Sequence, residues 1–151
     1  MEEKHIYAIA QFDAQTQQRL SALYLQLVNA GFTGTQTKGI PYHITLGTFD
    51  VADEALVASR AQAAARNARA FSIRLAFIGL FGLDVLFLAP AVKRQLLDLH
   101  QAIVPCGDSA DEHPWVAHTT LLMDTPDVIR QAVSVAAQHF IPFRATVESI
   151  G

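Results

Sequence analysis

Two copies of one four-residue pattern dominate this chain, H-I-T-L at residues 43–46 and H-T-T-L at residues 118–121. Each copy places a histidine and a threonine two positions apart in an apolar, β-branched stretch, which predicts a strand. Alternate side chains share a face of a strand, so His43 lies beside Thr45 and His118 beside Thr120. Two imidazoles could act as general acid and general base, and two hydroxyls could hold an oxyanion. This set of groups could cleave a phosphodiester without a metal ion.

The elements that carry these motifs follow the same order twice. In the first half, the periodicity predicts a strand at Ile6–Phe12, a helix ending near Gly31, a motif strand from Tyr42 to about Thr48, an Ala-rich helix from about Asp53 and a strand at Phe71–Ile78. In the second half, it predicts a strand at Val85–Ala89, a helix with apolar positions from Val92 to Ile103, a motif strand at roughly Val116–Met123, a helix beginning at Thr125-Pro126-Asp127 and a strand at Phe143–Ile150.

The last strands of the two halves also resemble each other in sequence. Both begin with Phe and end with Ile-Gly; the phenylalanines are 72 residues apart and the motif histidines 75. We therefore predict an α+β fold made of duplicated β-α-β-α-β halves related by a pseudo-two-fold axis. Two antiparallel sheets would face a central groove, with the helices outside. The 151 residues predict a single domain, 1–151, with lobes at approximately 1–79 and 80–151.

Composition narrows the class of partner. With 11 basic and 14 acidic residues, the formal net charge of −3 favours a small nucleotide-like substrate over long nucleic acid, which usually binds to a basic surface. No apolar run is long enough to span a bilayer, and the first residues lack the features of a signal peptide. The single cysteine, Cys106, cannot form an internal disulfide, so a cytoplasmic location is expected. The sequence does not indicate an oligomeric state.

Other candidate sites are weaker. His113 and His118 lie near three acidic residues, Asp108, Asp111 and Glu112, but no recognised ligand spacing supports a metal site there. The chain also lacks a glycine-rich phosphate loop, so no metal and no cofactor are predicted. Tyr7 shares a strand face with Gln11 and could line a groove as a substrate-binding residue. Tyr42 and Trp115 precede the motifs at positions that favour packing.

Paired H-x-T-x motifs, one in each half of a duplicated domain, resemble the two-histidine (2H) phosphoesterase superfamily. The opening strand at 6–10, the motif segment P-Y-H-I-T-L at 41–46 and the segment V-A-H-T-T-L at 116–121 are similar to its bacterial branch of 2′-5′ RNA ligases and cyclic nucleotide phosphodiesterases. The resemblance covers nearly the whole chain. Thr119 departs from it, because the family more often has an aliphatic residue at this position.

The resemblance implies hydrolysis of a 2′,3′-cyclic phosphate on a nucleotide or RNA end. His43 and His118 would be the catalytic acid and base, with His118 as base by analogy with family members. Thr45 and Thr120 would bind the non-bridging phosphate oxygens. The alternatives are a 2′-5′ RNA ligase or phosphodiesterase acting on oligonucleotides, and a non-catalytic nucleotide-binding module.

Overall fold

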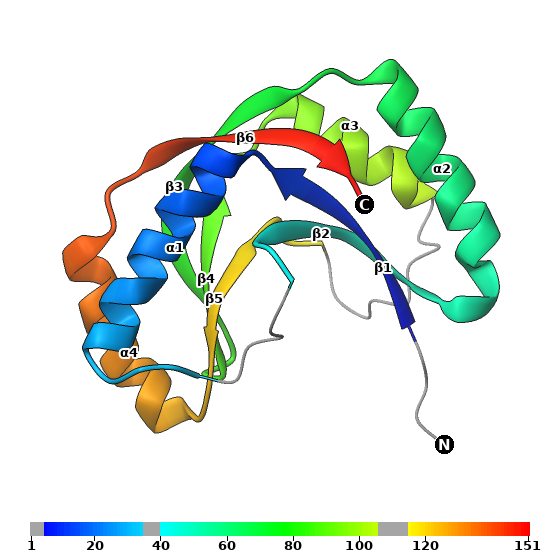
Figure 1. The fold of residues 1–151 in the computed structure, drawn as a ribbon. Helices are drawn as coiled ribbons and strands as arrows, with labels where there is room; N and C mark the ends of the chain where they lie inside the picture. Colours follow the sequence, from blue (N-terminus) through cyan, green and yellow to red (C-terminus); the bar gives the residue numbers. More distant parts are fainter. Residues whose placement is uncertain (1–4, 35–39, 106–114) are drawn as a thin grey trace.

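The computed structural model describes residues 5–34, 40–105 and 115–151. Within these ranges the chain forms the predicted elements in the predicted order (Figure 1): β1 (His5–Phe12), α1 (Ala14–Asn29), β2 (His43–Asp50), a short 3-10 helix (Val51–Asp53), α2 (Glu54–Asn67), β3 (Phe71–Phe81), β4 (Val85–Pro90), α3 (Arg94–Ile103), β5 (Thr119–Met123), α4 (Pro126–His139) and β6 (Phe143–Ile150). The fold is therefore α+β, as predicted.

The strands pair in the order β2-β1-β6-β3-β4-β5, and every pair is antiparallel. This order is symmetric, because each strand of the first half has its counterpart at the mirrored position. The two predicted sheets are joined into one, since the last strands of the halves, β3 and β6, pair with each other. Ile73 lies opposite Ala145, 72 residues further along the chain. The register at the centre of the sheet is therefore the one that a pseudo-two-fold axis requires.

The connection between the halves falls later than the sequence indicates. β3 continues to Phe81, so the expected lobe boundary at 79/80 lies inside this strand. The turn that follows spans residues 82–84 and leads into β4. Gly82 occupies it with a φ of +53°, a conformation that glycine adopts without steric cost.

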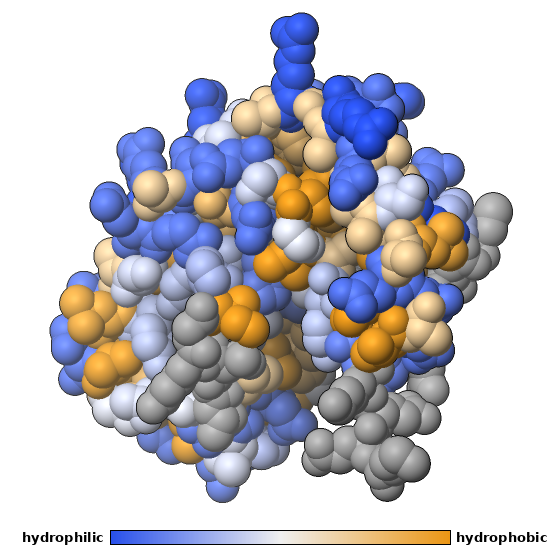
Figure 2. Space-filling view, turned by 45° about the vertical axis from the view of Figure 1, so that its right-hand side comes forward, coloured by the Kyte–Doolittle hydropathy of each residue, from blue (hydrophilic) through white to orange (hydrophobic). Residues whose placement is uncertain are grey.

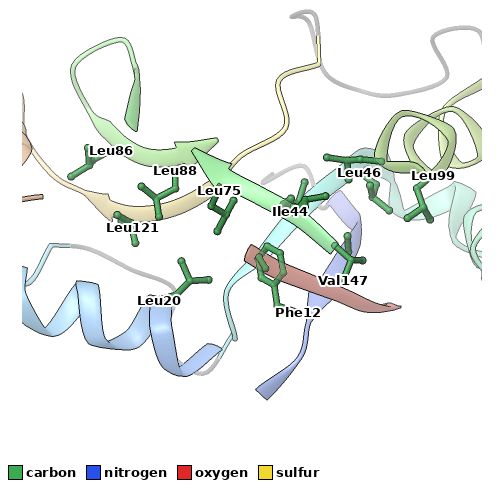
Figure 3. Packing of buried hydrophobic residues seen from close by; sticks show 14 of the residues in the cluster. Phe12, Leu20, Ile44, Leu46, Leu75, Leu86, Leu88, Leu99, Leu121 and Val147 are labelled. Carbon is green, nitrogen blue, oxygen red and sulfur yellow. The ribbon is translucent and has the colours of Figure 1, made fainter. Parts of the chain in front are cut away.

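The helices pack in pairs that mix the two halves: α1 lies against α4, and α2 against α3 (Figure 1). Their apolar faces and one face of the sheet form a continuous hydrophobic core. Figure 3 shows Ile44 of β2, Leu75 of β3 and Val147 of β6 directed toward this core. The two halves are thus held together by shared helix pairs as well as by the β3–β6 pairing.

Side-chain and backbone caps fix both ends of α1. Asp13 accepts a hydrogen bond from the backbone N–H of Thr16 (2.9 Å), and hydrogen bonds from Thr16 hold the pKa of the Asp13 carboxyl below its usual range. The Thr16 hydroxyl also accepts from the backbone N–H of Thr146 in β6 (3.0 Å). At the other end, Gly31 has a φ of +98° and Phe32 N–H donates to Leu27 O, which forms a Schellman motif.

On the face shown in Figure 2, hydrophobic side chains lie in small groups between polar ones. No helix among residues 5–34, 40–105 and 115–151 has the length and hydrophobicity needed to cross a membrane.

Candidate active site

The first motif begins β2. Ile44 and Leu46 are fully buried in the core, whereas His43 and Thr45 are half-buried on the opposite face. In the register with β1, Gln11 lies opposite His43 and Ile9 opposite Thr45. The predicted shared face of the imidazole and the hydroxyl is therefore present in the structure.

The second motif straddles the start of β5. This strand begins at Thr119, three residues later than predicted, so His118 lies immediately before it. The side chains still share one side of the sheet, because Thr120 pairs with Phe87 of β4 and the His118 ring contacts that same phenylalanine. The ring centroids of His118 and Phe87 are 5.2 Å apart, and Phe81 meets His118 edge to face at 4.6 Å.

Both histidines are oriented by the same hydrogen bond. His43 Nδ1 lies 2.9 Å from the carbonyl oxygen of Pro41, and His118 Nδ1 lies 2.8 Å from that of Val116. A carbonyl only accepts, so Nδ1 carries the proton and donates in each ring. Nε2 therefore bears the lone pair of the neutral imidazole and is the nitrogen that can exchange a proton with a substrate. Each carbonyl belongs to the residue two positions before the histidine.

Each motif also contains a β-bulge at the same position. Between the pairs Ile9–Thr45 and Ala8–Gly47, β2 has one extra residue, Leu46. Between Phe87–Thr120 and Leu86–Leu122, β5 has one extra residue, Leu121. The fourth residue of each motif is therefore the bulged one. Because a bulge increases the local twist, both strands bend immediately after the threonine.

Two aromatic side chains from the second half cover the exposed edge of β2. The indole N–H of Trp115 donates to the carbonyl of Thr45 (3.0 Å), and His100 Nδ1 donates to the carbonyl of Leu46 (2.7 Å). The two rings stack with centroids 3.9 Å apart. β2 is an edge strand of the described sheet, so no described strand pairs with it on that side. Trp115 lies three residues before His118, and its hydrogen bond therefore ties the approach to the second motif to the first motif.

Strands β2 and β5 contact each other although they stand at opposite ends of the sheet order. Figure 1 shows their starting ends close together. β2 begins at His43, and His118 immediately precedes β5. The structure thus brings the strands that carry the two motifs into contact, as a pseudo-two-fold arrangement predicts.

A cavity of about 330 Å³ opens beside His43. Its polar lining includes Gln11, Glu148 and Ser149, and the Ser149 hydroxyl donates to the Gln11 side-chain oxygen (2.7 Å). The side chain of Gln17 holds the segment before His43, because its amide bonds both the N–H and the C=O of Tyr42. The first histidine therefore faces more polar surroundings than the second.

The two tyrosines singled out in the sequence differ in position. Tyr42 packs against the core, and burial raises the pKa of its phenol to about 12. It is therefore neutral at ordinary pH, which fits a packing residue. Tyr7 is 59% exposed and lies on the same side of β1 as Ile9 and Gln11, the side that carries the first motif.

The residues considered for a metal lie mostly outside the described ranges: His113, Asp108, Asp111 and Glu112 fall within 106–114, as does Cys106. Among the described residues, no cluster of three or more His, Cys, Asp or Glu side chains could hold a metal ion.

The sequence did not predict the ring contacts of Phe81 and Phe87 with His118. It also did not predict the hydrogen bonds of Trp115 and His100 to β2. The apolar run at 85–89 gave no signal that Phe87 points away from the core. Leu86 and Leu88, which flank Phe87, are fully buried, so Phe87 lies on the other face of the strand. In an entirely apolar run, the sequence does not show which of the two faces meets the core.

An α+β fold whose symmetric sheet carries one histidine and one threonine from each half is the architecture of a 2H phosphoesterase. The model of the 2′-5′ RNA ligase superfamily matches residues 10–151, and the chain belongs to this superfamily. Its members are phosphoesterases and ligases that act on phosphodiester bonds.

Solved structures show the same fold. The chain is similar to Escherichia coli LigT in its apo form, with a TM-score of 0.55 and 19% identity over 82% of this chain and 74% of LigT. It is also similar to E. coli LigT in complex with 3′-AMP, with a TM-score of 0.61 and 17% identity over 97% of this chain and 84% of LigT. No curated protein sequence matches the chain.

Proposed function

We propose that the protein hydrolyses a 2′,3′-cyclic phosphate on a nucleotide or on an RNA end, without a metal ion or cofactor. The observation that carries this proposal is the matched pair of Nδ1 hydrogen bonds, which leaves Nε2 as the proton-exchanging nitrogen of both His43 and His118. A purely structural histidine has no need of this common orientation in two copies.

The chemistry requires one proton acceptor and one proton donor. His118 takes a proton from water as its oxygen forms the new bond to phosphorus, and His43 gives a proton to the ribose oxygen as the ring P–O bond breaks. The product is a nucleoside monophosphate, and the two histidines end with exchanged protonation states. Thr45 and Thr120 donate hydrogen bonds to the non-bridging oxygens, whose negative charge grows toward the transition state.

The proposed substrate is small. The net charge of −3 disfavours long nucleic acid, and the related LigT was crystallised with 3′-AMP. Exposed Tyr7 lies on the motif side of β1 and would line the substrate groove. We also propose a cytoplasmic location, because the single cysteine cannot form an internal disulfide.

A 2′-5′ RNA ligase or phosphodiesterase acting on oligonucleotides is the second candidate, supported by membership of the 2′-5′ RNA ligase superfamily. It uses the same acid–base pair with roles exchanged in the direction of ligation. A binding module without catalysis would not need two histidines held in the same tautomer.

Hydrolysis of 2′,3′-cyclic AMP by the wild type and by His43→Ala and His118→Ala tests the proposal. Each replacement should lower turnover about 10²- to 10⁴-fold, the usual contribution of one acid or base. The double variant should lose less than the product of the single losses, because the pair acts as a unit. His139→Ala is the matched control, since this exposed residue ends α4 away from both motifs. A folded His43→Ala enzyme with full activity would overturn the assignment.

A further inference from the structure

Phe87 reaches His118 only because Gly79 has no side chain. Gly79 and Phe87 lie opposite each other in the β3–β4 pair. A Cβ added to Gly79 would come within 2.4 Å of the tip of the Phe87 ring, much closer than any normal contact. The Phe87 side chain is only 6% exposed and is held between Gly79, Phe81 and His118. Gly79 therefore leaves the space that the Phe87 ring occupies.

Gly151 occupies the equivalent place in the other half. Its backbone N–H and C=O both bond Ile9 (2.9 and 3.0 Å), and Ile9 pairs with Thr45 as Phe87 pairs with Thr120. A Cβ on Gly151 would come within 2.7 Å of the side-chain amide of Gln11. Gln11 lies directly opposite His43, at the close spacing of a cross-strand pair.

The two glycines are the ones that end the repeated Ile-Gly sequence, 72 residues apart. Neither is required by backbone conformation in the way that Gly31 and Gly82 are, since among the described glycines positive φ angles occur at Gly31, Gly34 and Gly82. What they share is a neighbouring side chain that a Cβ would displace. In each half that side chain lies beside the motif histidine.

We propose that Gly79 and Gly151 leave room for two positioning side chains, Phe87 and Gln11. Phe87 sets the orientation of the His118 imidazole, and Gln11 sets that of the His43 imidazole. This inference rests on the proposed acid–base function and adds residues that act through the histidines. The Phe87 ring limits the rotation of His118 by contact. Gln11, held by the Ser149 hydroxyl, limits that of His43 from the facing strand.

The test combines Gly79→Ala and Phe87→Leu in a double-mutant cycle, with kcat and KM for 2′,3′-cyclic AMP as readouts. Each single variant should lower kcat about 10- to 100-fold with a smaller change in KM, because misplacement of a reacting group by about 1 Å has costs of this size. Adding Gly79→Ala to Phe87→Leu should cause little further loss, since leucine lacks the ring tip that the new Cβ meets. Phe77→Leu is the control, because Phe77 lies on β3, the strand of Gly79, and is 56% exposed. It should keep its kcat.

A second readout does not need activity. ¹⁵N NMR of the imidazoles without substrate reports the tautomer of each histidine. Phe87→Leu should lower the Nδ1–H fraction of His118 alone, and Gln11→Ala that of His43 alone. Additive effects of Gly79→Ala and Phe87→Leu on kcat would overturn the inference, even if His118→Ala is inactive. An unchanged kcat and an unchanged tautomer in the folded variants would overturn it as well. If the wild type hydrolyses no cyclic phosphate but the two variants show these tautomer changes, the positioning roles of Phe87 and Gln11 would stand and the proposed function would be overturned.

Discussion

Trp115 and Thr45, 70 residues apart in sequence, are joined by a hydrogen bond from the indole N–H to the backbone carbonyl at 3.0 Å. This contact links the segment that leads to His118 with the strand that begins at His43. It also supplies a partner for a carbonyl on the outer edge of β2, where none of the described strands pairs. The geometry of the site therefore depends on a residue that is not part of either motif.

Trp115→Phe keeps an aromatic ring at the position that stacks on His100 but removes the indole N–H donor. We expect the free energy of unfolding to fall by about 1 kcal/mol, the usual net value of one hydrogen bond. kcat/KM should fall as well, because the two motifs lose a direct link. Urea denaturation and steady-state kinetics measure the two effects. Lys93→Met is the matched control, since Lys93 donates to the Ser72 carbonyl (2.7 Å) far from the motifs; it should lose stability and keep its activity.

Thr119 is the residue at which the second motif departs from the family pattern. Its side chain is 1% exposed, and its hydroxyl has no hydrogen-bond partner among residues 5–34, 40–105 and 115–151. Thr119→Val replaces this hydroxyl by a methyl group of similar size. We expect thermal denaturation to show a gain of about 1 kcal/mol, because an unsatisfied buried hydroxyl is costly. Turnover should not change, since Thr119 points into the core. A loss of stability would mean that the hydroxyl has a partner in solution.

Acid–base catalysis by two imidazoles predicts a bell-shaped dependence of kcat/KM on pH. The rate rises as the base loses its proton and falls at higher pH as the acid loses its own. An imidazole in water titrates near pH 6.5, so the optimum should lie roughly between pH 6 and 8. The two apparent values belong to the coupled pair. Residual activity of His118→Ala should lack the ascending limb and that of His43→Ala the descending limb. A flat profile from about pH 5 to 9, with chemistry limiting, would favour a binding module.

The proposed mechanism uses only imidazoles and hydroxyls, so hydrolysis should continue in excess EDTA. Assays before and after dialysis against the chelator measure this. Loss of activity that one added metal restores would point instead to a site that includes His113 and His118, and the His113→Ala variant would then lose the restoration while retaining its fold.

The sequence alone predicted the repeated order of elements, the faces of the motif strands and the two histidines as a pair. These properties follow from local periodicity, which backbone geometry imposes wherever a strand or helix forms. The Ile-Gly ends and the motifs recur at nearly constant separation, which led to the prediction of a pseudo-two-fold relationship; the symmetric strand order is compatible with it.

Tertiary structure decided the rest. The joining of the two sheets depends on the pairing of β3 with β6, and the extension of β3 to Phe81 depends on its pairing with β4. The stacking of Trp115 on His100 and the space above Gly79 arise between residues distant in sequence. Such contacts leave no periodic trace in the chain, because they are selected by the shape of the packed elements and not by the local conformation of either residue.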